Sequence, residues 1–514
     1  MAYLPYTQPT ADESTHGRYY VYGLVTLLVF IIFKHIYQIL ASPLRSVPGP
    51  ILARSTRLWE IYSVCKHDNP THNIALHEKY GPVVRLAPNR YSINDGEAAK
   101  MILGHHNAMD KSKFYHPFGQ PDEYNLFSEP SISVHGKVRR PLAQLYSQTS
   151  LLSYEPFVDT CNKILLQRLE EYAQGDKALD VRELMQYYAF DVIGEITVGS
   201  RFGLMEDGGD KSGIVEAIDE SLSYGAIIGL IPEWHWWIGM TMDMLRLKPS
   251  FRKILNFVNF HLENRVSGRT KSPEDRRDFL DKMLPMEQEG KATRFHTRQA
   301  TSQNIAAGSD TTAISLTAVI AYLTMYPSTL AALRHELDEA TAAGTLSDPA
   351  TFQEAQKLPY LQAVIMEALR IHPAVAAPMT RVVGPQGLVI AGQFFPPGTE
   401  VGVNAWVIHN NKSIFGADAH VFRPERWITK NKEDRAVLDR NFLAFGAGPR
   451  TCIGKNISLL EMSKVIPQIV RKYDFDILPG ENGERYTWRT RWFAKPSFNA
   501  VVRRRAEKAA REHQ

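Results

Sequence analysis

The sequence predicts one large globular unit, containing long helical segments, behind a short N-terminal membrane anchor. The chain has 514 residues, and no Ser/Gly-rich linker, low-complexity stretch or internal repeat divides it. An uncharged stretch near the N-terminus has the apolar character of a membrane span. A second apolar segment, from about His296 to Met325, has helical periodicity and is long enough to cross a whole domain.

Composition narrows the possible partners and compartments. Hydrophobic residues make up 44% and charged residues 22% of the chain, which is ordinary for a globular protein. The net charge of +4 is small and no Lys/Arg run suggests nucleic-acid binding, so we expect no nucleic-acid partner. The three cysteines, Cys65, Cys161 and Cys452, are too few for a disulfide framework. Most of the chain is therefore expected to face a reducing compartment.

The membrane anchor is predicted over residues 19–40, after an N-terminal tail of residues 1–18. Tyr19 to Phe33 contains no charged residue, and the apolar character resumes after Lys34. A cleaved signal peptide is the alternative, but it would begin with a basic segment, whereas this leader contains two acidic residues. Basic residues follow the anchor, so the positive-inside rule places its C-terminal side in the cytosol.

A proline-rich elbow is predicted over residues 41–58, and the remaining residues 59–514 form the predicted catalytic domain. The elbow contains Ser46-Val47-Pro48-Gly49-Pro50. Proline fixes φ and excludes helix, so this segment separates the anchor from the globular unit.

Ten residues near the C-terminus carry the strongest functional signal. Phe445 to Gly454, FGAGPRTCIG, fits F-x-x-G-x-R-x-C-x-G, a loop that holds a haem iron through one cysteine thiolate, here Cys452. A thiolate ligand favours O–O cleavage and hence oxygen activation over oxygen storage. The glycines let the backbone fold around the sulfur, and Arg450 can reach a haem propionate. The alternative is a buried structural cysteine on a Gly-rich turn.

The long predicted helix contains a second motif, AGSDTT, at residues 307–312. Gly308 and the polar residues after it are poor helix formers, so their place at mid-helix favours a functional role. Thr311 can donate to the carbonyl of Ala307 and open the helix locally. Such a pocket suits a diatomic ligand and its protons, with Asp310 as a candidate proton carrier. The alternative is a polar patch on a solvated face.

Charged residues elsewhere are predicted to hold the structure or the cofactor. Glu367 and Arg370 share a helix face, and Arg426 in FRPERW offers a second arginine. We expect this network to lock the segment that leads to the cysteine loop, with two unrelated surface pairs as the alternative. Arg139, on another helical segment, and Arg381 are weaker candidates for contacts with haem propionates.

Together these motifs resemble a membrane-bound eukaryotic cytochrome P450. The resemblance runs from the anchor to about residue 503 and includes His-x-x-x-Arg, A-G-x-D-T-T, E-x-x-R, F-x-P-E-R and the cysteine loop in the family's order. VPGPILARSTRLW, YGPVVRLAPN and TCIGKNISLLEM are similar to filamentous-fungal, pisatin-demethylase-like members that modify secondary metabolites. The resemblance implies a mainly α fold with small β-sheets, the family's triangular prism, preceded by one transmembrane helix.

The resemblance also assigns roles to the candidate residues. It implies that Cys452 is the proximal ligand of haem b and that Asp310 and Thr311 deliver protons. The residues implied to hold the haem are Arg139, Arg381, Phe445, Arg450, Cys452 and Gly454. Two departures are visible: His135 stands where many relatives carry tryptophan, and Trp427 stands where phenylalanine is common. Neither removes a group that the chemistry needs, because an imidazole N–H can still reach a propionate.

The implied function is a haem-thiolate monooxygenase that inserts one atom of O2 into a bulky apolar small molecule, such as a fungal terpenoid, polyketide or alkaloid. The chain has no flavin or dinucleotide motif. NADPH and flavins are therefore expected to act only through a membrane-bound NADPH–cytochrome P450 reductase, with cytochrome b5 as a further candidate partner. The resemblance places a single-pass monomer in the endoplasmic reticulum membrane, with its catalytic domain facing the cytosol.

Substrate contacts are predicted in four places: residues 112–130, residues 306–307, residues 374–379 and residues 492–493. The alternative for each is simple core packing. Trp234, Trp236 and Trp237 form either a second membrane contact or an ordinary aromatic core cluster.

Other outcomes of the same haem chemistry stay open, namely desaturation, epoxidation, demethylation or carbon–carbon coupling. A rival from another class is a haem-binding sensor or carrier without turnover, which would not need Thr311. A third reading is a haem enzyme that uses peroxide and no reductase.

Overall fold

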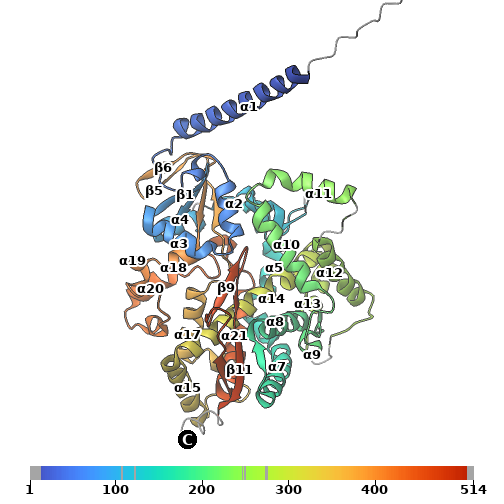
Figure 1. Ribbon diagram of the computed structural model, residues 1–514. Helices are drawn as coiled ribbons and strands as arrows, with labels where there is room; N and C mark the ends of the chain where they lie inside the picture. Colours follow the sequence, from blue (N-terminus) through green and yellow to red (C-terminus); the bar gives the residue numbers. More distant parts are fainter. Residues whose placement is uncertain are drawn as a thin grey trace, which may run out of the picture.

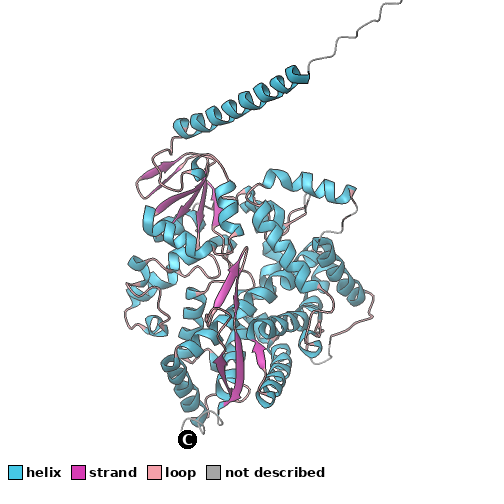
Figure 2. Ribbon diagram, in the orientation of Figure 1, coloured by secondary structure: helices cyan, strands magenta, loops and turns pink. Residues whose placement is uncertain are grey.

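The computed structural model describes residues 13–105, 108–120, 123–245, 247, 250–272 and 276–505. Helices make up most of the globular part, and the strands form small sheets (Figure 2). The predicted mainly α architecture with small β-sheets is therefore confirmed. The first twelve residues of the predicted tail, and residues 506–514 of the predicted domain, lie outside the described residues.

The helices, in chain order, are α1 (Glu13–Ala41), α2 (Leu58–Cys65), α3 (Asn69–Tyr80), α4 (Gly96–Leu103), α5 (Ile132–Ala143), α6 (Gln148–Leu152), α7 (Glu155–Gly175), α8 (Val181–Val198), α9 (Leu204–Asp207), α10 (Ile214–Ile228), α11 (His235–Met244), α12 (Ser250–Val266), α13 (Phe279–Gln288), α14 (Arg294–Met325), α15 (Pro327–Ala342), α16 (Phe352–Ala355), α17 (Pro359–Ile371), α18 (Ala405–His409), α19 (Lys412–Phe415), α20 (Lys432–Asn441) and α21 (Lys455–Lys472). Short 3-10 helices are η1 (Leu52–Arg54), η2 (Lys113–Phe118), η3 (Gln144–Tyr146), η4 (Pro232–Trp234), η5 (Pro424–Ile428) and η6 (Gly448–Arg450).

The strands are β1 (Val83–Ala87), β2 (Arg90–Ile93), β3 (Ala178–Asp180), β4 (Met379–Val382), β5 (Leu388–Ile390), β6 (Gln393–Phe395), β7 (Glu400–Val403), β8 (Tyr473–Ile477), β9 (Thr487–Thr490), β10 (Ala494–Ser497) and β11 (Asn499–Arg504). They form a four-stranded sheet of order β1-β2-β7-β4, a three-stranded sheet β3-β11-β8, and the hairpins β9–β10 and β5–β6. The β2–β7 pair is parallel, and the other pairs are antiparallel.

Helix α1 projects from the globular part and packs on none of it (Figure 1). Its segment Arg18–Ala41 has a mean hydropathy of 2.0, and none of its residues whose side chains the structure describes is buried, so it is long and apolar enough to span a membrane. Helix α14 passes the same test of length and composition, but 72% of its apolar window is buried. Burial by protein identifies α14 as the central helix of the globule.

The predicted elbow packs against the globular part. Leu44 and Val47 belong to a buried apolar cluster with the β1-β2-β7 sheet. The amide of Arg85 in β1 donates to Pro48 at 2.8 Å. A Cβ at Gly49 would lie 2.5 Å from the Arg85 carbonyl oxygen, so this close approach requires glycine. The exit direction of α1 is thus fixed by contacts with β1.

Helix α14 has clear signals at both ends. Thr293 and His296 form a reciprocal capping box at its start, and Pro327 opens the next helix just after its end. The helix begins two residues before the predicted segment and ends at the predicted residue. It packs against α5, α8, α17 and α21, so it runs through the middle of the molecule.

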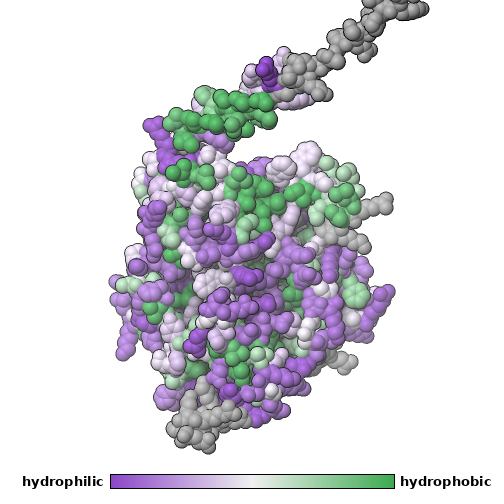
Figure 3. All heavy atoms as spheres, in the orientation of Figure 1, coloured by the Kyte–Doolittle hydropathy of each residue, from purple (hydrophilic) through white to green (hydrophobic). Residues whose placement is uncertain are grey.

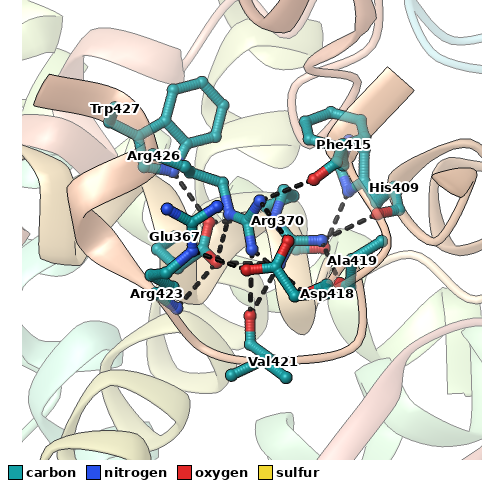
Figure 4. Close-up of polar contacts among 10 residues, drawn as sticks. All are labelled: Glu367, Arg370, His409, Phe415, Asp418, Ala419, Val421, Arg423, Arg426 and Trp427. Atoms are coloured by element: carbon teal, nitrogen blue, oxygen red, sulfur yellow. Dashed lines mark hydrogen bonds and ion pairs between the residues drawn. The ribbon is translucent and has the colours of Figure 1, made fainter. Parts of the chain in front are cut away.

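The carboxylate of Glu367 on α17 is fully buried and accepts five hydrogen bonds (Figure 4). Arg370 donates from Nε and Nη2, and Arg426 donates from Nε, each at 2.8 Å. The backbone N–H of Arg423 donates at 2.9 Å and the indole N–H of Trp427 at 2.8 Å. The predicted network of one glutamate and two arginines is therefore present, and Trp427 is a hydrogen-bond donor within it.

His409 connects this network to the cysteine loop. The amide of Leu443, two residues before Phe445, donates to His409 Nε2 at 2.8 Å, so the ring is neutral and Nδ1–H donates to the Arg370 carbonyl, also at 2.8 Å. Burial and the adjacent Arg370 charge lower the pKa of His409 to about 3. The imidazole therefore stays neutral and keeps both bonds at physiological pH.

Replacing Glu367 with glutamine should destabilise the protein strongly. The substitution keeps the side-chain shape but leaves Arg370 and Arg426 buried without their anion, which costs about 3–5 kcal/mol in comparable sites. Asp439→Asn, in the exposed Arg435–Asp439 pair, is the matched control and should cost less than about 1 kcal/mol. Denaturant unfolding followed by circular dichroism measures both, and equal losses would contradict a structural role for Glu367.

Candidate active site

The cysteine loop folds back on itself just before α21. The amide of Cys452 donates to the Phe445 carbonyl at 2.9 Å and closes the loop. Gly446 and Gly448 have φ of 69° and 67°, in the region that favours glycine. A Cβ at Gly448 would also clash with the carbonyl of Leu103. These two glycines are therefore required by the backbone path.

The thiol of Cys452 lies deep in the protein but retains accessible surface on one side. Burial raises its pKa, and the backbone N–H groups of Gly454 and Lys455, together with the charge of Arg139, act in the opposite direction. A Cβ at Gly454 would meet no protein atom within 4 Å. The loop thus directs N–H donors and positive charge at a sulfur that borders an open space.

Helix α14 has an accessible stretch in the middle of its otherwise buried length. Ala307 is exposed and Thr311 is half-buried, whereas most residues on either side are buried. Thr311 Oγ1 donates to the Ala307 carbonyl at 2.9 Å, as the sequence predicts. Thr312 donates to Ser458 at the start of α21 at 3.1 Å, so this stretch neighbours the cysteine loop.

Asp310 points to a different side of α14 from Thr311. Its carboxylate is buried, and Oδ1 accepts from Gln186 Nε2 on α8 at 2.5 Å. Oδ2 lies 3.3 Å from Lys495 Nζ on β10. Asp310 and Thr311, the predicted acid and alcohol, are thus adjacent in sequence but contact different parts of the protein.

A cluster of basic side chains lies near Cys452, with Arg139 as its member beside the thiol. Burial and the charges of Arg381 and Arg450 hold the pKa of Lys111 well below its usual range. Burial and four neighbouring cations lower the pKa of His135 to about 3, and burial with the Arg381 charge lowers that of Arg450 to about 10. Within the described part of the chain, Lys111, Arg139, Arg381 and Arg450 form no ion pair. Buried charges are normally paired, so this cluster is suited to bind an anionic group.

Comparison with known proteins identifies the family. The family model for cytochrome P450 matches residues 50–497 of the chain. The chain is a cytochrome P450. It is 42% identical to a pisatin demethylase from Fusarium vanettenii, over 94% of this chain and 93% of the relative.

Two further relatives extend the comparison. The chain is 38% identical to a cytochrome P450 monooxygenase from Aspergillus terreus, over 86% of this chain and 93% of the relative. It is 35% identical to a cytochrome P450 monooxygenase from Penicillium aethiopicum, over 89% of this chain and 93% of the relative. The predicted family, fungal relationship and fold class are confirmed, and the protein is a haem-thiolate monooxygenase.

The residues of this P450 fit the haem that the family implies. A thiol with converging N–H donors supplies the iron ligand, and the unpaired cations match an anionic edge such as the propionates. Arg450 already donates from both terminal nitrogens to the carbonyls of residues 129 and 130, at 2.6 Å each, and its Nε has no partner. That free N–H is the group left for a ligand.

Lys111 was missed by the sequence analysis. It lies outside the recognised motifs and reaches the cluster because residue 111 forms an isolated β-bridge with Arg381. Its ammonium donates to the Phe127 carbonyl and lies 4.1 Å from the centre of the Tyr115 ring. A basic residue alone in a loop gives no pattern that sequence could have detected.

Three of the four predicted substrate-contact segments meet in one apolar cluster. Five aromatic rings contact one another, and the centroids of contacting rings are 4.7–6.5 Å apart. We call these rings the aromatic wall: Phe114, Tyr115, Phe118, Phe127 and Trp492. Ala374, Ala377 and Phe493 belong to the same cluster, and α10 adds Ala226, which sequence reasoning did not include. Of the fourth segment, Ala307 is exposed and Ala306 packs toward α8, α10 and α12.

The three clustered tryptophans are not core residues. Trp234, Trp236 and Trp237 are 60%, 53% and 57% exposed on η4 and α11. The alternative of an aromatic core cluster is therefore wrong. Large exposed aromatic side chains at adjacent positions indicate a contact surface.

Replacing Lys111 with methionine should weaken haem retention without destabilising the haem-free protein. The ammonium is buried among other cations, so only an anionic ligand compensates its charge. A charge-assisted hydrogen bond of ordinary strength predicts about tenfold faster haem loss. Haem transfer to a scavenger protein gives the rate, and unfolding of the haem-free protein gives the stability. Lys113→Met, at an exposed position, is the control, and identical rates in the two variants would refute the assignment.

Proposed function

We propose that this P450 uses O2 and electrons from an NADPH reductase to oxidise a bulky apolar secondary metabolite in a fungus. The observation that carries the proposal is that Cys452 is solvent-accessible in its loop and lies near the accessible stretch of α14, which bonds to Ser458 at the start of α21. Haem bound there would supply the oxygen activation. Absence of a flavin or dinucleotide motif supports an external electron donor, for which the reductase and cytochrome b5 are the proposed partners.

Each site residue has a proposed task. Cys452 provides the thiolate, stabilised by the N–H groups of Gly454 and Lys455 and by Arg139. The loop from Phe445 to Gly454 fixes the direction of that sulfur. Arg381 and Arg450, with Lys111, neutralise the anionic edge of the cofactor. These tasks are all electrostatic or positional, so the protein supplies orientation while the cofactor supplies reactivity.

Asp310 and Thr311 are the proposed proton carriers. The hydroxyl of Thr311 lies on the accessible side of α14, where it can hold a proton beside the reacting oxygen. Asp310 lies on the buried side and accepts from Gln186, so its carboxyl must rotate about its side-chain bonds to pass a proton to that side. The arrangement separates proton supply from the substrate space.

The aromatic wall supports an apolar and at least partly aromatic substrate. Its rings come from η2, from the loop between η2 and α5, and from the turn before β10, and the surrounding residues include small apolar ones. A relative carries the name pisatin demethylase. Oxidative demethylation is therefore the second candidate outcome, beside hydroxylation.

A fungal P450 with this activity should form product only with reductase, NADPH and O2, and Thr311→Ala should uncouple it. Loss of the hydroxyl removes a proton carrier, so we expect product per NADPH to fall at least about tenfold while peroxide rises. Thr317→Ala is the control, because Thr317 makes the same backbone bond but is fully buried. A metabolite extract of the host supplies the substrates. Substrates are recognised as compounds that shift the haem spectrum and disappear during the reaction.

The rival readings give different results in the same assay. A sensor or carrier would shift spectrally without consuming NADPH. A peroxide-using enzyme would form product without reductase. If Thr311→Ala keeps the coupling of the unsubstituted protein, the proton-delivery role is wrong.

We propose that this P450 is a single-pass protein of the endoplasmic reticulum membrane whose Trp234–Trp237 segment also enters the bilayer. Exposed apolar residues gather where α1 leaves the globule, namely Ile51, Leu52 and Leu58, and continue to η4 and α11 (Figure 3). The Arg57–Glu233 ion pair, at 2.8 Å, joins these two regions. Tryptophan favours the headgroup layer, which supports a second contact beside the anchor.

Brominated lipids should quench the tryptophan fluorescence of the protein in nanodiscs. Quenching requires contact with the acyl chains, so it should largely disappear when Trp234, Trp236 and Trp237 are all changed to phenylalanine. Trp427→Phe is the control, since Trp427 is buried in the Glu367 network. Quenching that survives the triple substitution would place the segment outside the bilayer.

A further inference from the structure

Gln303 lies on the accessible face of α14, one turn before Ala307. Residues 303, 307 and 311 are spaced by four, so their side chains lie on one side of the helix. Ala307 is exposed, and Gln303 and Thr311 are half-buried. Ile314, three turns after Gln303 on the same side, belongs to the apolar cluster that contains the aromatic wall. Gln303 therefore lies on the face of α14 that carries Thr311 and meets the aromatic wall.

The carboxamide of Gln303 has no partner within the protein. Among the residues that the structure describes, none forms a hydrogen bond with this side chain. A carboxamide offers two N–H donors and one oxygen acceptor, and the half-buried position removes part of this group from water. A polar group that is neither paired nor fully hydrated favours a ligand that supplies the missing partner. Gln303 thus has the chemistry of a ligand-binding group.

Gln299, one turn before Gln303, has an unsatisfied oxygen. Its Nε2 donates to Glu123 Oε1 at 3.3 Å. Because a carboxylate accepts and does not donate, the nitrogen of this amide must face Glu123 and the oxygen must face away. The side chain of Gln299 is buried, and its Oε1 has no hydrogen-bond partner in the described part of the chain. A buried carbonyl oxygen of this kind gains from any nearby N–H donor.

The position of Gln299 is tied to the loop that carries part of the aromatic wall. Its partner Glu123 also pairs with Arg298, at 2.5 Å between Oε1 and Nη2. Glu123 and Phe127 belong to the same loop, between η2 and α5. One carboxylate therefore joins this loop to the turn of α14 that precedes Gln303.

Gln303 is the neighbour that can satisfy the Gln299 oxygen. Side chains four residues apart on a helix have Cβ atoms about 5–6 Å apart, so rotation of its side chain brings Gln303 Nε2 to Gln299 Oε1. The oxygen of Gln303 is then left on the accessible face of α14. An amide oxygen accepts hydrogen bonds and does not donate them. It therefore distinguishes a hydroxyl from an ether or a ketone.

We propose that Gln303 is a specificity-determining residue that accepts a hydrogen bond from a hydroxyl of the substrate, with its carboxamide oriented by Gln299. At about 1.5 Å per residue, Gln303 lies about 12 Å from Thr311 along the helix axis. The hydroxyl and the oxidised carbon therefore belong to different rings. The substrate class is a hydroxylated aromatic compound of at least two rings. This inference rests on the proposed function, in which the substrate lies between the aromatic wall and α14.

A substrate without the hydroxyl should bind more weakly. It would remove water from the Gln303 oxygen without replacing the lost hydrogen bond, and a site built to pair with a hydroxyl rejects such an analogue. A net hydrogen bond together with the avoided desolvation predicts a preference of at least about tenfold.

The test titrates the haem-loaded full-length protein with three probes and follows the haem spectrum. The probes are 4-phenylphenol, biphenyl and 4-methoxybiphenyl, which share two rings and differ in the hydroxyl. We expect 4-phenylphenol to bind at least about tenfold more tightly than the other two. Gln303→Met, which keeps the length of the side chain without the amide, should remove this preference and leave the affinity for biphenyl unchanged. Gln303→Leu should behave in the same way, which separates loss of the amide from a change in packing.

Gln299→Met tests the orientation of the Gln303 amide. Without the Gln299 oxygen, Gln303 can turn its nitrogen toward the ligand, so the difference between 4-phenylphenol and 4-methoxybiphenyl should shrink. Gln288→Met is the matched control, because Gln288 is exposed at the end of α13, and it should change no affinity.

Several results would overturn the inference. Equal affinity of the unsubstituted protein for the three probes would do so, as would the absence of a spectral shift with all of them. A preference for 4-phenylphenol that survives Gln303→Met would place the hydroxyl elsewhere, and a shift toward the low-spin form would place its oxygen on the iron. The titration needs neither reductase nor NADPH. Absence of product with both would therefore count against the proposed function alone, and the titration would still decide the role of Gln303.

Discussion

The buried carboxylate of Glu367 is the constraint on which the proximal half of the molecule depends. An isolated charge cannot remain in a protein interior, so the chain must bring donors to it from wherever they lie in the sequence. Three of the five bonds come from residues more than fifty positions away, and the other two come from Arg370, one turn on (Figure 4). Satisfying one anion therefore fixes the whole segment that precedes the cysteine loop.

The constraint reaches the sulfur through backbone contacts. Arg370 presents its carbonyl to His409, and His409 accepts the amide of Leu443. From Leu443 the loop closes on itself when Cys452 donates to Phe445. A carboxylate on one helix thus determines the direction of a thiol on another part of the chain, with a neutral imidazole as the link.

The parts of this site that sequence predicts are those encoded by local spacing. The cysteine loop, the Thr311–Ala307 bond and the Glu367–Arg370 pair each lie within a short motif whose geometry follows from a helix turn or a glycine. Lys111, Lys495 and His409 carry no such pattern, because a β-bridge, a hairpin and a loop amide bring them into place. The exposure of Trp236 and Trp237 likewise depends on tertiary packing, which a run of aromatic residues does not reveal.

Charge placement separates the three tasks of the site. Lys111, Arg139, Arg381 and Arg450 form one cluster and have no ion pair among the described residues, so an anionic cofactor would compensate their charge. The substrate side is apolar and aromatic, so it offers no competing charge. The buried acid Asp310 lies on another side of α14, where Lys495 lies between it and Asp219 of α10. Thr311 lies on the accessible side of α14 and Asp310 on its buried side, so the central helix separates the acid from the hydroxyl.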